Sequence, residues 1–167
     1  EFLDTMSSSE IKENGVVYTP SWIADHIVEG AIEQWKKFNR GKDSPECIAD
    51  YCCGTGVFIG SALKSISNRS WDTKIYGLEK NVKALEIAKK NFGKSAIYAS
   101  GDLLFDDFGK KKYDIIVSNP PYVSSSNLSP EYKKRIKSAY QSSSQGNFDL
   151  SIVFVEKIIE SLAPNGI

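Results

Sequence analysis

Apolar residues are arranged along the chain in two patterns, one of regular spacing and one of short continuous runs. In four segments they return every three to four positions, which predicts amphipathic helices. The first helix has Trp22, Ile27 and Trp35 among its apolar positions, and Ser21 can cap its start. Pro130 can begin a further short helix within a serine-rich stretch. The four predicted helices lie within residues 15–38, 57–66, 82–92 and 149–162, and the first of them begins after its cap at Ser21.

Short apolar runs, bounded by turn residues, fall between these helices and predict strands at 46–51, 73–79, 95–100 and 113–118. Strands that alternate with helices imply an α/β fold, in which a mostly parallel sheet carries helices on both faces and binds ligands at the carboxyl ends of its strands. The final "LAPNGI" resembles a turn that feeds another strand. We therefore expect a sheet truncated at its C-terminal end, in a fragment of a longer protein.

Composition narrows the class of protein. With 167 residues, 41% hydrophobic and 25% charged, the chain suits one globular domain, and its 21 basic residues balance 21 acidic ones. It is therefore not the strongly basic body typical of a phosphate-dominated nucleic-acid binder. The three clustered cysteines suit neither a disulfide framework nor a zinc site, which favours reduced thiols in the cytoplasm.

We expect neither a membrane-spanning nor a targeting segment in this sequence, and we interpret its first residues apart from the rest. We find no apolar stretch of membrane-spanning length and no signal peptide. Residues 1–14 are interpreted as a polar leader, with a cloning remnant as one explanation for part of it, and residues 15–167 as one incomplete catalytic domain.

A glycine turn follows the first predicted strand. Gly54 and Gly56 allow the backbone to approach a ligand, and the amides of the next helix begin there. Gly60 lies one position too late for the dinucleotide fingerprint G-x-G-x-x-G. A tight turn with packing glycines therefore stays open as the alternative.

Acidic residues end the next two strands. Glu79 lies 23 positions after Gly56, near the offset at which an acid accepts from ribose hydroxyls, although an acid that caps the helix ahead of Asn81 is equally compatible. Asp102 follows the third strand and could accept from an adenine amine, or could be a simple turn residue.

The fourth strand ends in the loop "SNPPY". Two prolines stiffen it, the Asn119 side-chain carbonyl and the Pro120 backbone carbonyl are acceptors, and Tyr122 offers an aromatic face. Two acceptors can hold a planar amine by both hydrogens and direct its lone pair at an electrophilic methyl group. A loop that only stops the strand explains this composition less well.

Read in order, the segments "GVVYTP", "ADYCCGTGVFI", "YGLEKN", "GD", "SNPPY" and "NFDL" resemble the motifs of S-adenosylmethionine-dependent DNA adenine-N6 methyltransferases. The motif order resembles the gamma arrangement of restriction-modification methylases, and it covers the chain from Gly15 onward. Tyr51 and Cys52 depart from the family, which commonly has proline and often glycine at these positions.

The resemblance implies a Rossmann-like class I methyltransferase fold, S-adenosylmethionine as cofactor, S-adenosylhomocysteine as product and no metal. Tyr18, Thr19 and Pro20 would close over the methionine end of the cofactor, Glu79 would hold its ribose, and Asp102 its adenine. The implied catalytic residues are Asn119, Pro120, Pro121 and Tyr122; the implied cofactor-binding residues are Tyr18, Thr19, Pro20, Asp50, Gly54, Thr55, Gly56, Phe58, Glu79, Asp102 and Asn119; and Asp149 would support the site.

Several alternatives stay open. The same loop would suit a methylase of protein glutamine or of RNA base amines, or a fragment that binds the cofactor without transfer. We expect duplex DNA to be bound through parts absent from this chain. A specificity subunit, a restriction subunit or a fused endonuclease are further partners to consider, and no membrane contact is expected.

His26 is expected to be a half-buried structural residue. The basic cluster Lys133, Lys134, Arg135 and Lys137 could meet phosphate, but a solvated helix face is favoured about two to one.

Overall fold

The computed structural model describes residues 19–106, 108 and 111–167. Contacts divide them into two compact units, one formed by Thr19–Asn119 with Ser161–Ile167, and the other containing Pro120–Glu160. We call these the sheet unit and the loop unit. Tyr18 lies outside the described residues, so its predicted role is not addressed by the structure.

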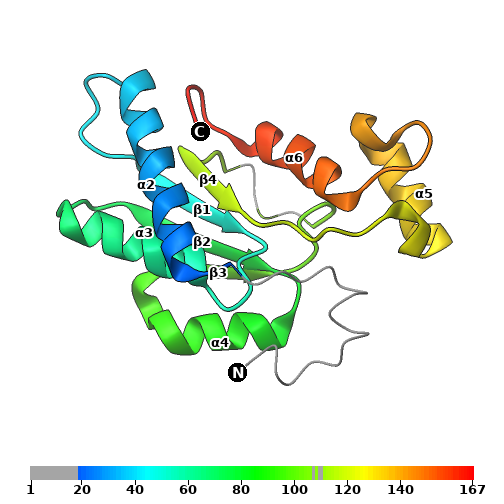
Figure 1. Cartoon of the computed structure of the whole chain (residues 1–167), viewed down its shortest axis with the longest axis horizontal. Helices are drawn as coiled ribbons and strands as arrows, with labels where there is room; N and C mark the ends of the chain where they lie inside the picture. The colour runs from blue at the N-terminus through cyan, green and yellow to red at the C-terminus, as the bar shows by residue number, and fades with distance from the viewer. Residues whose placement is uncertain (1–18, 107, 109–110) are drawn as a thin grey trace. The chain divides into compact units, whose positions relative to one another are not determined.

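The sheet unit is built on four parallel strands (Figure 1). They are β1 (Cys47–Tyr51), β2 (Lys74–Glu79), β3 (Ile97–Ser100) and β4 (Ile115–Ser118), in the order β3-β2-β1-β4. All five β1 residues are buried, as expected for a central parallel strand. From β1 the chain adds β2 and then β3 on one side of β1, and it then crosses over to add β4 on the other side. The strand order therefore reverses between β1 and β4. In an open parallel sheet, this is the place where ligands bind.

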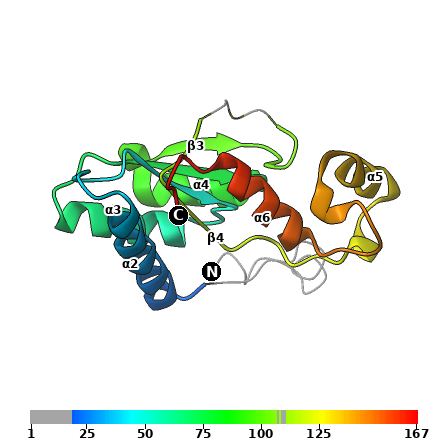
Figure 2. The same cartoon turned by 90° about the horizontal axis from the view of Figure 1, so that it is seen from above.

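Three helices of the sheet unit are α2 (Ser21–Phe38), α3 (Val57–Asn68) and α4 (Val82–Phe92). All three contribute buried side chains to one core with β1, β2 and β4, among them Trp35, Ile59 and Leu85. Figure 2 shows α2 and α3 side by side. The α/β fold class with a parallel sheet is therefore confirmed.

Some details of the helices differ from the sequence prediction. The N-cap of α2 is Pro20, and Ser21 is its first residue and caps nothing. The buried side of α2 is formed by Ala24, Val28, Ile32 and Trp35, so Trp22 and Ile27 are exposed. His26 is also exposed, so its half-buried placement was wrong. An apolar pattern wide enough to cover most of a helix does not reveal which side faces the core.

The residues that end the sequence pack beside β4. The Tyr113 amide donates to the Ser161 carbonyl, and the Ile116 amide donates to the Ile167 carbonyl at 2.8 Å. Ile167 in turn donates to the Asp114 carbonyl. The two hydrogen bonds of Ile167 have the pattern of a parallel pairing beside β4.

The loop unit contains α5 (Pro130–Ala139) and α6 (Leu150–Ser161), the last residue of which belongs to the sheet unit. Ser129 caps α5 and Pro130 is its first residue, as predicted. The Glu156 carboxylate on α6 accepts from the amides of Gln141 and Ser142, which ties the chain after α5 to α6. No helix within the described ranges is long and apolar enough to cross a bilayer.

Candidate functional site

The turn after β1 has a backbone that only certain residues adopt easily. Gly54 and Gly56 have φ of 55° and 94°, and a Cβ on Gly56 would lie 2.7 Å from the Phe92 ring. Position 56 therefore requires glycine for two reasons, its positive φ and the lack of room for a Cβ beside Phe92. A Cβ on Gly60 would lie 3.0 Å from the same ring, so this third glycine serves helix packing.

Cys52 also has a left-handed backbone, with φ of 63°. Such a conformation is uncommon for a residue with a Cβ, which explains why glycine is the more frequent residue there in the family that the sequence resembles. Burial raises the pKa of the Cys52 thiol well above its usual range, and the carboxylates of Glu79, Asp50 and Asp102 add to the shift. This thiol is held uncharged, in agreement with a packing role rather than a reactive one.

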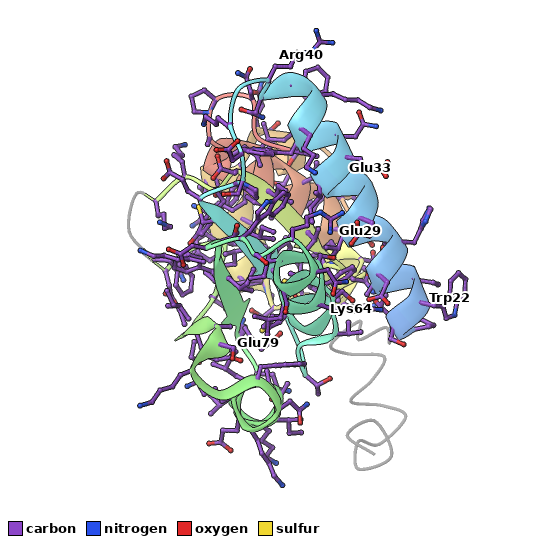
Figure 3. All side chains as sticks on the ribbon, turned by 90° about the vertical axis from the view of Figure 1, so that its left-hand side faces the viewer. Trp22, Glu29, Glu33, Arg40, Lys64 and Glu79 are labelled. Atoms are coloured by element: carbon purple, nitrogen blue, oxygen red, sulfur yellow. The ribbon has the colours of Figure 1, made fainter. Side chains whose placement is uncertain are left out.

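Glu79 joins the end of β2 to the glycine turn. Its Oε2 accepts from the Gly54 amide at 2.9 Å, and its Oε1 accepts from the Asn81 amide at 2.7 Å. Asn81, not Glu79, caps α4, since its side chain accepts from Lys83 and Ala84. Each carboxylate oxygen has a second lone pair, so the Glu79 carboxylate can accept from ligand hydroxyls while it fixes the turn. Figure 3 labels Glu79 beside the sheet.

Asp50 has the least compensated carboxylate of the described residues. It is 2% exposed, and neither oxygen has a hydrogen-bond partner within the described part of the chain. Burial raises its pKa well above the usual range, and the charge of Glu79 raises it further. A buried, unpaired carboxylate of this kind can be compensated by a cationic ligand.

Asp102 follows β3 and forms hydrogen bonds with three nearby residues. Its Oδ2 accepts from Lys80 Nζ at 3.0 Å, its Oδ1 accepts from the Leu104 amide, and its own amide donates to Asp106 at 2.7 Å. Lys80 directly follows Glu79 and Asp106 lies four positions after Asp102, so both could have been predicted as partners of Asp102 from their nearness in sequence. The contact with Lys80 leaves the predicted adenine role of Asp102 untested.

Asn119 lies directly after β4, beside the end of β1. The register pairs Asp50 with Val117 and Tyr51 with Ser118, and the Ser118 hydroxyl donates to the Tyr51 carbonyl. Asn119 Nδ2 donates to Thr19 Oγ1 at 3.0 Å, across 100 positions of sequence. The structure therefore brings Thr19 and Asn119 into contact, a pairing that their separate motifs did not reveal.

The remaining predicted residues have simpler surroundings. Phe58 is buried in the core of the sheet unit, and Thr55 is partly exposed in the glycine turn. In the loop unit Tyr122 is 56% exposed, and Pro120 and Pro121 precede it. Asp149 Oδ1 accepts from the Ser151 amide at 2.9 Å at the start of α6, which is a capping contact. Within the described ranges no group of three histidine, cysteine or acidic residues is placed to hold a metal ion.

Comparison with known proteins places this arrangement in a family. The model of the Eco57I restriction-modification methylases matches residues 62–167. The type II methyltransferase M.CvrRI of Paramecium bursaria Chlorella virus XZ-6E is 30% identical over 122 residues, 73% of this chain and 28% of the viral protein. The release factor glutamine methyltransferase of Buchnera aphidicola is 40% identical over 92 residues, 53% of this chain and 31% of that enzyme. The chain thus spans about a third or less of these two relatives.

Solved structures agree on the fold. A Listeria monocytogenes structure described as a class I S-adenosylmethionine-dependent methyltransferase has a TM-score of 0.71 and 16% identity, and it covers 98% of this chain and 53% of its own. At that identity the likeness shows the fold alone, which is the class I methyltransferase fold expected from the sequence. Taken with the match over residues 62–167, this identifies the chain as a member of the Eco57I restriction-modification methylase family.

Proposed function

We propose that the chain is the catalytic part of an S-adenosylmethionine-dependent DNA adenine-N6 methyltransferase, the modification component of a restriction-modification system. The observation that carries the proposal is the position of Asn119, the first residue of the N-P-P-Y sequence. It lies at the carboxyl end of β4, beside β1 and its glycine turn, where an open parallel sheet binds its ligands.

Three features of the sheet unit support S-adenosylmethionine as the cofactor. The glycine turn allows a close approach of the backbone, and Glu79 at the end of β2 has acceptor capacity for ribose hydroxyls. The Asp50 carboxylate is buried without a partner among the described residues, and Glu79 and Asp102 add negative charge nearby. This environment suits a cofactor that carries an ammonium and a sulfonium. Thr19, Pro20, Thr55 and Phe58 are proposed contacts on the resemblance alone.

The bound cofactor supplies an electrophilic methyl group on sulfur. In the proposed reaction, the lone pair of the adenine amine forms a bond to the methyl carbon, the carbon–sulfur bond breaks, and its electron pair stays on sulfur. The nitrogen becomes an ammonium and then loses a proton to solvent. The Asn119 side-chain oxygen accepts from the amine and stabilises the charge that develops on it. The roles of the Pro120 carbonyl, Pro121 and Tyr122 rest on the motif and not on a measured geometry.

Substitution of Asn119 by alanine in the complete gene product tests this assignment. Because Asn119 is proposed to act on the amine, we expect methyl transfer to fall at least a hundredfold while the cofactor dissociation constant changes less than about threefold. Asn68→Ala is the matched control, since Asn68 is exposed at the end of α3 and should affect neither. Loss of cofactor binding in Asn119→Ala with retained folding would show that the assignment is wrong.

A second candidate is the methylation of glutamine in protein, favoured by the 40% identity with a release factor glutamine methyltransferase. A glutamine amide is planar and offers two hydrogens, as the adenine amine does. Tritiated S-adenosylmethionine should be offered to the complete gene product with unmodified bacterial genomic DNA, with RNA and with release factors. We expect label in DNA only. Label in release factor or RNA would replace the proposed substrate, and no transfer to any of them would favour a binding fragment.

We also propose duplex DNA as the partner. A base within a duplex must be flipped out, and contacts with the DNA must offset the few kcal/mol of unstacking. The chain has a formal net charge of zero, so most of these contacts are expected from regions outside it, from a specificity or restriction subunit or from a fused endonuclease domain. On α5, Lys134 and Arg135 are exposed, while Lys137 donates to the Gly146 carbonyl at 2.9 Å.

A further inference from the structure

The side-chain amide of Asn119 can point in two directions that have nearly the same shape. Rotation by 180° about its last torsion exchanges the oxygen with the NH₂ group at almost no steric cost. Only one direction serves the proposed reaction, because the amine donates hydrogens and requires the oxygen. In the other direction two donors would face each other, so the site needs a group that selects the productive direction.

Thr19 is placed to make that selection. Its Oγ1 accepts from Asn119 Nδ2 at 3.0 Å, which turns the NH₂ group toward Thr19 and the oxygen away from it. Thr19 and Asn119 both belong to the sheet unit and are both partly buried. Water therefore competes less for this hydrogen bond than it would for one at the surface.

Both partners stand on fixed backbone. Thr19 precedes Pro20, which restricts its conformation, and the Pro20 carbonyl accepts from Ile23 and Ala24 at the start of α2. The buried side of α2 anchors this start to the core. Asn119 lies between Ser118, whose hydroxyl donates to the Tyr51 carbonyl, and Pro120. A hydrogen bond between two such positions can set a side-chain direction at little cost in entropy.

We propose that Thr19 is a positioning residue, which orients the Asn119 amide so that its oxygen faces the planar amine of the substrate. This inference rests on the proposed function and adds a role for Thr19 beyond contact with the cofactor. A hydroxyl can also donate, so the selection by Thr19 is strongest when another acceptor takes its proton. An acceptor atom on the bound cofactor would take this proton and leave only the lone pairs of Thr19 for Asn119. Cofactor binding would then strengthen the selection of the productive direction.

The test uses the replacement of Thr19 by valine, which has the same shape and lacks the hydroxyl, and by serine, which keeps it. In the 15N-labelled chain of 167 residues, we assign the Asn119 side-chain NH₂ signals by their loss in Asn119→Asp. We expect slow NH₂ proton exchange in the wild type and in Thr19→Ser, and exchange at least threefold faster in Thr19→Val. Thr19→Ala serves in place of valine if that variant does not fold. Unchanged exchange in the valine or alanine variant overturns the proposal.

A double-mutant cycle on methyl transfer separates positioning from cofactor contact. In the Asn119→Asp background both ends of the side chain are oxygens, so its direction no longer matters. At saturating cofactor we expect Thr19→Val to lower kcat about tenfold in the wild-type background, and less than twofold in the Asn119→Asp background. An equal loss in both backgrounds would mean that Thr19 acts only on the cofactor or the fold, and would overturn the proposal. If the wild-type complete gene product transfers no methyl group to DNA, RNA or release factor, the proposed function fails instead, and the proton-exchange result still tests the positioning.

Discussion

At the scale of single residues, Asp50 shows most clearly how a site can weaken the fold that carries it. Its carboxylate is buried without a partner in the described chain, and burial raises its pKa. The folded state therefore binds the Asp50 proton more tightly than the unfolded state, whose pKa is near 3.8. The stability from this proton is complete below that value, and it is lost as the pH rises toward the pKa of the folded state.

Asn cannot ionise at this position, so Asp50→Asn should raise the melting temperature by a few degrees at pH 8. The advantage should shrink toward pH 4, as the unfolded state begins to bind the Asp50 proton as well. The same change removes the charge proposed to meet the cationic cofactor, so the affinity for S-adenosylmethionine should fall about tenfold or more. Thermal melts from pH 4 to 8 and calorimetric titration measure the two effects. A variant that is less stable at pH 8 and binds normally would contradict this account of Asp50.

At the scale of elements, helix ends were easier to predict than helix faces. The observed bounds of α4 match the prediction because Asn81 and Gly93 act locally, as a cap and as a left-handed stop. The buried side of α2 could not be read from its sequence, because apolar residues surround much of the helix and only the side with Val28 and Ile32 packs into the core. Spacing alone could not identify that side of α2.

Two ion pairs, Lys64 with Asp25 and Arg69 with Glu29, join α3 and the residue that ends it to α2. Figure 3 labels Glu29 on α2 and Lys64 on α3. Glu29 on α2 accepts from Arg69 Nη2 at 2.6 Å and from the Ser65 hydroxyl, and Arg69 lowers the pKa of Glu29. The stabilisation is present above the unfolded pKa near 4.5 and is lost as the pH falls through the folded value.

Glu29→Gln should therefore lower the free energy of unfolding at pH 7 by about 0.5 kcal/mol, a small value because the pair is partly exposed and screened by solvent. The difference from the wild type should shrink as the pH falls below 4.5 and through the lowered pKa of Glu29 in the folded state. Urea titrations across this range measure it, with Glu33→Gln as the control one turn further along α2. Glu33 makes no ion pair with a described residue, so equal losses in the two variants would rule out the pairing as the cause.

At the scale of the whole molecule, the sequence predicted which motifs end which strands, but not how they meet. The order β3-β2-β1-β4 places Asn119 next to β1, and no local pattern contains that order. The contact between Thr19 and Asn119 joins residues 100 positions apart, so spacing could not indicate it. The contact of Glu79 with Gly54 likewise depends on the pairing of β1 with β2.

The central claim, a binding site for S-adenosylmethionine at the strand ends, is tested most directly by calorimetric titration of this chain. Glu79→Gln is the informative variant, since glutamine keeps one acceptor oxygen for the backbone and loses the charge proposed to hold the ribose. Glu86→Gln is the control, because Glu86 is exposed on α4. We predict one binding site in the wild type, affinity at least tenfold weaker in Glu79→Gln, and unchanged affinity in Glu86→Gln. Equal affinity in both variants, or no binding by the folded chain and by the complete gene product, would contradict the claim.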